Sequence, residues 1–231
     1  VILLVRDALG AVSSAARNIT VEMPSLEGSG QQDEFVNGLL GSAGNLLQNG
    51  DAEAVLVSVK GLSSVLNSAS EARRRRRLRR HLLQGEGAEE EEVEEAAAVT
   101  KAQADRTQMS SLAYASLEVM PPSASMGEWA AETQAGVLGA PEEVGPETKN
   151  TTFALFGAVL GMSAGPEAAD GLSEGAGASV ARGLTSLVAA PVASDEELTD
   201  TAAAAVGVLD GVGAAFLRNL AAGEAPAEVA T

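Results

Sequence analysis

Apolar residues recur every three or four positions along most of the 231-residue chain, which predicts α-helices. One such pattern covers residues 2–19 and another covers about 33–48. Asn49-Gly50 ends the second helix, because glycine accepts the left-handed backbone that often follows a helix. Asp51 can cap a third helix that continues through Leu66. The connection is so short that these two helices should form an antiparallel hairpin.

Five further helices are expected after residue 96, and the chain marks their ends with proline and with capping residues. The pattern as a whole predicts an all-α fold, an array of antiparallel helical hairpins. The expected marks are Pro121-Pro122 after a helix at 97–119, a capping box Ser125/Glu128, Pro146 at a helix start, Pro191 after a helix at 172–190, and a second capping box Ser194/Glu197. In the last helix the apolar positions are Leu198, Ala205, Val206, Leu209, Val212, Phe216 and Leu220.

Residues 70–96 interrupt the apolar pattern with two runs of charge. Seven arginines fall within residues 73–80, and seven glutamates follow within residues 86–95. Clustered arginines cannot be buried without partners, and surface ion pairs contribute only about 0–1 kcal/mol each. We therefore expect a flexible, exposed and protease-sensitive insert. It would separate an N-terminal helical half, residues 1–69, from a C-terminal half, residues 97–231, neither of which depends on it.

Composition excludes several classes of function. The formal net charge is −17, whereas a nucleic-acid-binding protein needs a basic face, so no nucleic-acid partner is expected. The chain has no cysteine and one histidine, which leaves no thiolate metal site and makes a multi-histidine site hard to build. No stretch approaches the roughly 18–20 apolar residues that span a bilayer, so direct membrane insertion is not expected.

The chemical motifs in the chain are incomplete. Residues 161–165 satisfy G-x-S-x-G around Ser163, but a helix precedes this serine where a nucleophile elbow needs a strand. The only histidine, His81, lies upstream in the charged segment. A G-x-G-x-x-G pattern fails because Val180 stands where the third glycine is needed. The sequence predicts no catalytic residue, no metal site and no cofactor, and hence no enzyme.

Two kinds of modification site are present. Asn18 and Asn150 each begin an N-x-[ST] sequon and are possible glycosylation sites, although both also suit ordinary helix ends. Arg77, Arg79 and Arg80 form an R-x-R-R pattern, which proprotein convertases cleave. The arginine run is also open to three other interpretations: a nuclear import signal, a docking site for acidic partners or lipid headgroups, or a low-complexity insert.

Two segments resemble a known family. LLGSAGNLLQNGDAEAVLVSVKGLSSVLNS and VLGAPEEVGPETKNTTFALFGAVLG both place a short acidic turn before an apolar helix. This pattern resembles the helical subdomain of the GAIN domain in polycystin-1-type proteins with a REJ region and in adhesion receptors. The resemblance covers most of residues 33–68 and 105–220. It differs at the autoproteolysis site, where the family has His-Leu-Thr/Ser and this chain has only His81-Leu82-Leu83.

The resemblance implies a non-catalytic interaction or support module. Such a module would lie on the extracellular side of a plasma or ciliary membrane, within a larger membrane protein. Its partners would be other proteins or other domains of the same chain. The residues alone leave a second hypothesis open, an intracellular, cytoplasmic helical scaffold whose arginine run serves docking or import.

Overall fold

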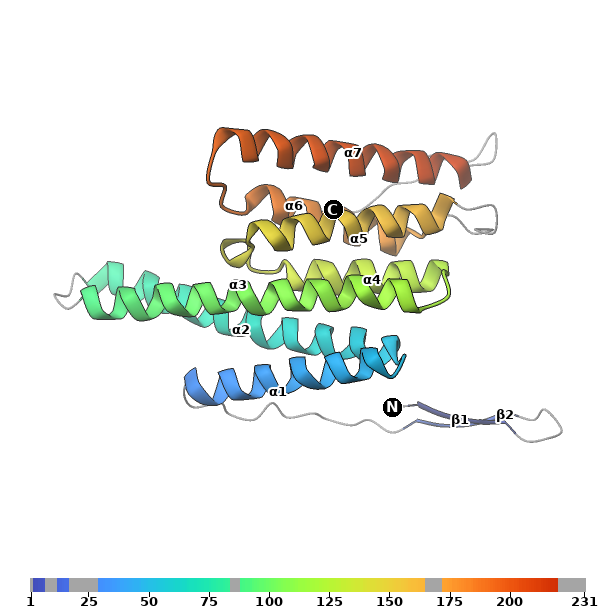
Figure 1. The fold of residues 1–231 in the computed structure, drawn as a ribbon, viewed down its shortest axis with the longest axis horizontal. Coiled ribbons are helices and arrows are strands. Elements are labelled where there is room, and N and C mark those ends of the chain that lie inside the picture. The colour runs from blue at the N-terminus through green and yellow to red at the C-terminus, as the bar shows by residue number, and fades with distance from the viewer. Residues whose placement is uncertain (1, 7–11, 17–28, 84–87, 165–171, 220–231) are drawn as a thin grey trace. The chain divides into compact units, whose positions relative to one another are not determined.

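The computed structural model describes residues 2–6, 12–16, 29–83, 88–164 and 172–219 (Figure 1). The chain divides into two compact units, Val1–Phe35 and Val36–Thr231.

The first unit contains a two-stranded antiparallel sheet. Strand β1 (Ile2–Arg6) pairs with strand β2 (Val12–Ala16), with Ile2 opposite Ala16 and Arg6 opposite Val12. The helix predicted over residues 2–19 is therefore wrong for residues 2–6 and 12–16, and residues 7–11 and 17–19 lie outside the described chain. The physical reason lies in Ile2 to Val5, a continuous apolar run with β-branched ends, which suits a short strand better than one face of a helix.

Helices make up the regular structure of the second unit, and α1 begins in the first. This confirms the expected all-α fold, to which the β-hairpin is the exception within the described residues. The elements are α1 (Ser29–Gln48), α2 (Ala52–Leu83), α3 (Ala88–Val119), α4 (Ala124–Val137), a 3-10 turn η1 (Pro141–Glu143), α5 (Pro146–Ala164), α6 (Glu174–Ala189) and α7 (Asp195–Asn219).

The turn between α1 and α2 forms as the sequence predicts. Gly50 has a φ of 78°, a left-handed backbone that glycine adopts without strain. Asp51 Oδ1 accepts a hydrogen bond from the backbone N–H of Ala54 at 3.1 Å, which satisfies a donor that the helix leaves unpaired.

The caps of the later helices are partly as predicted. Ser194 Oγ accepts from the backbone N–H of Glu197 at 3.1 Å, so the predicted serine cap of α7 is confirmed. The cap predicted for α4 is wrong, because Ser123 rather than Ser125 accepts from the backbone N–H of Met126, at 3.2 Å. Ser123 follows two prolines and has the extended backbone that an N-cap needs.

Two apolar clusters hold the second unit together. One joins α1 and α2 to Met109 and Leu112 of α3 and to Val137 of α4. The other runs through α3, α4, α5, α6 and α7 around Phe156. Helix α3 packs on α2, α4 and α5, whereas the principal described contacts of α7 are with α5 and α6. Helix α7 thus lies at one end of the array in Figure 1.

The charged segment 70–96 differs from its prediction as a flexible insert. Helix α2 continues to Leu83 and α3 begins at Ala88, so every described residue of the segment is helical. Arginine and glutamate are good helix formers, and the helix turns Arg73 toward a buried carboxylate. The helical halves expected at 1–69 and 97–231 also share an apolar cluster.

Candidate functional site

The most distinctive surface of the second unit is an apolar stripe on α7, which we call the outer stripe. Thr201, Ala205 and Val212 face the packed side of the helix and are buried. A second set of residues recurs at the same three- or four-residue spacing, so it occupies another face of the same helix. Its members are all exposed: Leu198, Ala202, Val206, Leu209, Gly213 and Leu217.

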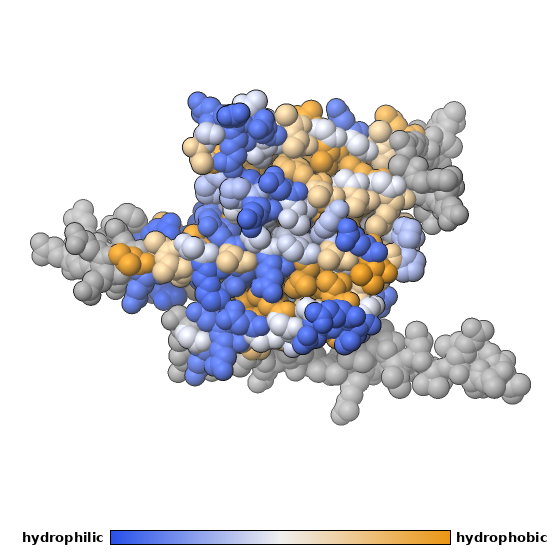
Figure 2. Space-filling model, viewed as in Figure 1, coloured by the Kyte–Doolittle hydropathy of each residue, from blue (hydrophilic) through white to orange (hydrophobic). Residues whose placement is uncertain are grey.

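Acidic residues border the outer stripe. By helical periodicity Asp195 stands in line with it at the N-terminal end and Asp210 stands along one edge. Figure 2 shows hydrophilic side chains gathered at one end of the upper row, which is α7, and apolar side chains among more polar ones along the rest. Asp195–Leu217 is also the one described helical stretch that is long and apolar enough to cross a membrane, with mean hydropathy 1.4. The expectation of no direct membrane insertion stays a prediction.

A buried polar cluster surrounds Glu143 of η1, which packs on α3 and α6. Arg106 of α3 donates to Glu143 Oε2 from Nη2 at 2.9 Å and from Nε at 3.0 Å. Arg106 also donates to Asn67 Oδ1 at 2.9 Å and to the carbonyl oxygen of Val137. The other carboxylate oxygen of Glu143 accepts from Ser70 Oγ at 2.6 Å. One carboxylate thereby joins α2, α3 and η1.

The charges in this cluster are almost fully removed from water. Arg106 is 0% exposed and Glu143 is 1% exposed. Burial lowers the pKa of Arg106 because it penalises the charged guanidinium, while the Coulombic attraction and the hydrogen bonds of Glu143 oppose that effect. Every face of the pair is occupied by protein groups, so we interpret the cluster as a structural joint rather than a ligand site.

A second buried joint involves Lys149 of α5. Its Nζ donates to the carbonyl oxygen of Pro191 at 2.7 Å and to Glu197 Oε1 at 2.8 Å. Glu197 Oε2 accepts from the backbone N–H of Ala193 at 2.7 Å. The hydrogen bond from Lys149, and then the one from Ala193, lower the pKa of Glu197. This joint fixes the start of α7 against α5.

The structure describes one of the two predicted glycosylation sites, Asn150. Asn150 is exposed on α5, while the hydroxyl of its sequon partner Thr152 is buried. Thr152 Oγ1 donates to the carbonyl oxygen of Thr148 at 2.7 Å and accepts from Gln134 Nε2 at 2.6 Å. Asn18 lies outside the described residues. Glycosylation of either residue stays a prediction.

The predicted convertase site lies within α2. Arg77 donates to Glu95 Oε1 of α3 from Nε at 2.8 Å and from Nη2 at 2.5 Å. Arg79 is exposed on the same helix, and the backbone of Arg80 is helical. The structure thus brings Arg77 into contact with another element. Cleavage at this site stays a prediction.

The serine motif does not form a nucleophile elbow among the described residues. Ser163 lies on α5 and its Oγ donates to the carbonyl oxygen of Val159 at 3.1 Å, which is an ordinary contact along a helix. His81 belongs to α2. Within the described chain no three His, Cys, Asp or Glu side chains lie together so that they could hold a metal ion.

The buried roles of Arg106 and Glu143 were not predicted from the sequence. The signal that could have found Arg106 is its position three residues before Met109, on the apolar side of α3. A charged residue at such a position needs a buried partner. Nothing local marks Glu143 over its neighbour Glu142, because its role depends on three separate elements.

Comparisons of the chain with protein-family models, curated proteins and solved structures found no match. The resemblance to the helical subdomain of the GAIN domain therefore rests on the sequence pattern of residues 33–68 and 105–220.

Proposed function

We propose that this chain is a non-catalytic helical interaction and support module. It would act on the extracytoplasmic side of a membrane, as part of a larger polycystin-like or adhesion-receptor-like protein. The observation that carries the interaction is the outer stripe of α7, where Val206 is 57% exposed and Leu217 is 70% exposed. Contiguous apolar patches of this kind on soluble domains mark contact surfaces.

The chemistry of the stripe defines its partner. An apolar ridge that follows one helix suits a second amphipathic helix, whose own apolar side chains pack against it. The carboxylates of Asp195 and Asp210 at its borders favour lysine or arginine along the partner's flanks. A second copy of this chain would bring its own acidic borders, so we assign the stripe to a basic amphipathic helix of another protein or domain.

A binding experiment tests this assignment. The probe is a fluorescently labelled amphipathic helical peptide with a leucine ridge and lysine flanks, and fluorescence anisotropy measures its binding to the 231-residue chain. In the double variant V206D/L209D we expect affinity to fall at least roughly tenfold, because two charges would be buried without partners. Both side chains are exposed, so the fold should persist in circular dichroism.

The control separates the stripe from general attraction to an acidic protein. The variant A203D/G207D adds the same two negative charges at exposed α7 positions outside the stripe. We expect it to bind the peptide as tightly as the unmodified chain or slightly tighter. Equal losses in the two double variants, or no loss in either, would overturn the assignment of the stripe.

The proposed location has its own test. If the chain passes through the secretory pathway, glycans should occupy Asn18 or Asn150, and removal of N-glycans should increase its mobility on a gel. The variants N18Q and N150Q show which site is used. The chain can be directed into the secretory pathway by a fused signal peptide. If it then carries no glycan at either site, the result would favour the cytoplasmic scaffold hypothesis instead.

A further inference from the structure

Helix α2 sorts the arginine run into two faces. Arg73 and Arg77 turn toward η1 and α3, where Arg73 Nη2 lies 2.5 Å from Glu143 Oε1 and Arg77 Nη2 lies 2.5 Å from Glu95 Oε1. At 3.6 residues per turn, Arg75 and Arg79 point to the other side of the helix. The run therefore contains arginines that pair with other elements and arginines that point outward, and the sequence alone does not distinguish them.

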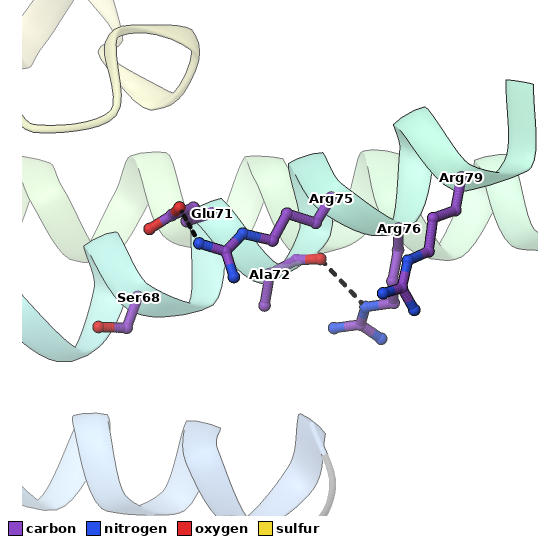
Figure 3. A pocket seen from close by; sticks show the side chains of 6 residues that line it. All are labelled: Ser68, Glu71, Ala72, Arg75, Arg76 and Arg79. Atoms are coloured by element: carbon purple, nitrogen blue, oxygen red, sulfur yellow. Dashed lines mark hydrogen bonds and ion pairs between the residues drawn. The ribbon is translucent and has the colours of Figure 1, made fainter. Parts of the chain in front are cut away.

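The outward-pointing arginines line an open groove along α2, which we call the arginine groove. Its volume is about 450 Å³ and it extends over three helical turns. Figure 3 shows the guanidinium groups of Arg75, Arg76 and Arg79 along this face of the helix. The lining residues are Ser68, Glu71, Ala72, Arg75, Arg76 and Arg79.

Charge in the groove is only partly neutralised. Arg75 pairs with Glu71 at 2.5 Å, four residues earlier on the same helix. Arg76 Nε donates to the carbonyl oxygen of Ala72 at 3.5 Å, which leaves its charge uncompensated. Neither Arg76 nor Arg79 forms an ion pair with a residue that the structure describes, and both are exposed. Two guanidinium groups one helical turn apart are thus available to an anionic ligand.

We propose that the arginine groove binds an acidic segment of a partner protein, with Asp or Glu carboxylates of that segment paired to Arg76 and Arg79. Guanidinium groups bind carboxylates in a planar, two-bond geometry that suits this pairing. The groove is open and about 17 Å long by the rise of its helix, so an elongated ligand fits it better than a small ion. This surface is separate from the outer stripe of α7 and does not depend on the function proposed for it.

The charge of the remaining molecule favours a narrow segment over a broad anionic surface. The chain carries a formal net charge of −17, and Glu94 and Glu95 lie on α3, which is paired with the same helix through Arg77. A bilayer of anionic lipids or a nucleic acid would be repelled by this surrounding charge. A peptide strand or helix that follows α2 would meet three arginines and one carboxylate, that of Glu71, which is already paired with Arg75.

Fluorescence anisotropy with a labelled glutamate-rich peptide of about 12 residues, which matches the groove at 1.5 Å per residue, tests the proposal. We expect binding at low salt that weakens as ionic strength rises, because exposed charges are screened. The variant R76E/R79E should bind roughly tenfold more weakly, since two exposed ion pairs become repulsions. Its melting temperature should stay close to that of the unmodified chain, because both side chains are exposed and neither forms an ion pair with a described residue.

The matched control reverses two charges elsewhere. Arg182 is exposed on α6 and Lys60 is exposed on α2, so R182E/K60E changes the net charge by the same amount away from the groove. We expect it to weaken peptide binding by no more than about twofold. Equal weakening in the two double variants would overturn the proposal.

A second variant tests the groove by gain of affinity. E71Q removes the carboxylate that occupies Arg75 and should bind the acidic peptide roughly two- to fivefold more tightly. E53Q, at an exposed position near the start of the same helix, makes the same change in charge and should have a smaller effect. Binding of phosphatidylserine vesicles and of inorganic phosphate is measured for comparison with the peptide. Preferential binding of either over the peptide, with the same dependence on Arg76 and Arg79, would show that the ligand is not an acidic protein segment.

Discussion

Arg106 of α3 and Glu143 of η1 form an ion pair that water does not reach, with Nη2 and Oε2 separated by 2.9 Å. The same carboxylate also accepts from Ser70 and Arg73 of α2. A buried charge pair of this kind is costly to desolvate and becomes far more costly when one partner is missing. The pair therefore specifies how three elements meet more than it adds to stability.

The first prediction follows from this burial. R106M should lower the free energy of unfolding by about 3–5 kcal/mol, because it leaves the Glu143 carboxylate buried without its main partner. The double variant R106M/E143M should be more stable than R106M alone, since it removes both charges. Urea denaturation of both proteins measures the difference. A double variant that is less stable than the single one would show that the pair contributes net stability.

The second prediction concerns the arginine run. R73M should lower the free energy of unfolding by about 1–3 kcal/mol, because Arg73 donates to the buried Glu143. R74M changes the adjacent exposed arginine and should alter stability by no more than about 0.5 kcal/mol. Thermal and urea unfolding of the two variants give the comparison. Equal stability of both would restore the prediction that this segment is an insert on which the fold does not depend.

Local features of this fold follow from the sequence because their causes are local. Gly50 and Asp51 determine the turn between α1 and α2 within four residues, and Ser194 caps α7 in the same way. The strand at Ile2–Arg6 was missed because the residues fit two patterns, the helical spacing of three and four and a continuous apolar run typical of a strand. Pairing with β2, which the local sequence does not reveal, favours the strand.

The partners of charged residues could not be predicted in the same way. Arg73 and Arg77 pair with Glu143 and Glu95, which are 70 and 18 residues away in the chain. No spacing rule links such positions. The exposure of Leu209 could not be predicted either. A helix with two apolar faces has the same periodicity whether other helices pack on one face or on both.

The third prediction tests the contact between the Phe156 ring of α5 and Gly183 of α6. A Cβ atom at Gly183 would lie 2.5 Å from Cζ of Phe156, whose ring is fully buried. G183A should therefore lower the free energy of unfolding by about 1–3 kcal/mol through overpacking.

The matched control for this packing is Gly207 of α7, where a Cβ atom would meet nothing within 4 Å. G207A should raise the free energy of unfolding by about 0.5–1 kcal/mol, since alanine favours a helix over glycine. Differential scanning calorimetry of both variants measures the two signs. A loss of stability in G207A equal to that in G183A would mean that helix packing does not distinguish the two positions.

The last prediction concerns the pH dependence of the joint between Lys149 and Glu197. The hydrogen bonds from Lys149 and from the backbone N–H of Ala193 lower the pKa of Glu197 in the folded chain. A glutamate in the unfolded chain titrates near a pKa of about 4.3. The stability that the ionised Glu197 contributes is therefore fully present above that pH and is lost as the pH falls through the lower pKa of the folded state.

The variant E197Q isolates this contribution, because its amide does not titrate. The difference in free energy of unfolding between the unmodified chain and E197Q should be constant near neutral pH and should shrink below about pH 4.3. E196Q provides the control, since Glu196 is exposed and forms no ion pair with a described residue, so near neutral pH this substitution should change the free energy of unfolding less than E197Q does. Urea unfolding at a series of pH values measures both differences. If the E197Q difference instead grew as the pH fell, the folded state would favour the protonated carboxyl, and the ion pair with Lys149 would not be what fixes α7 to α5.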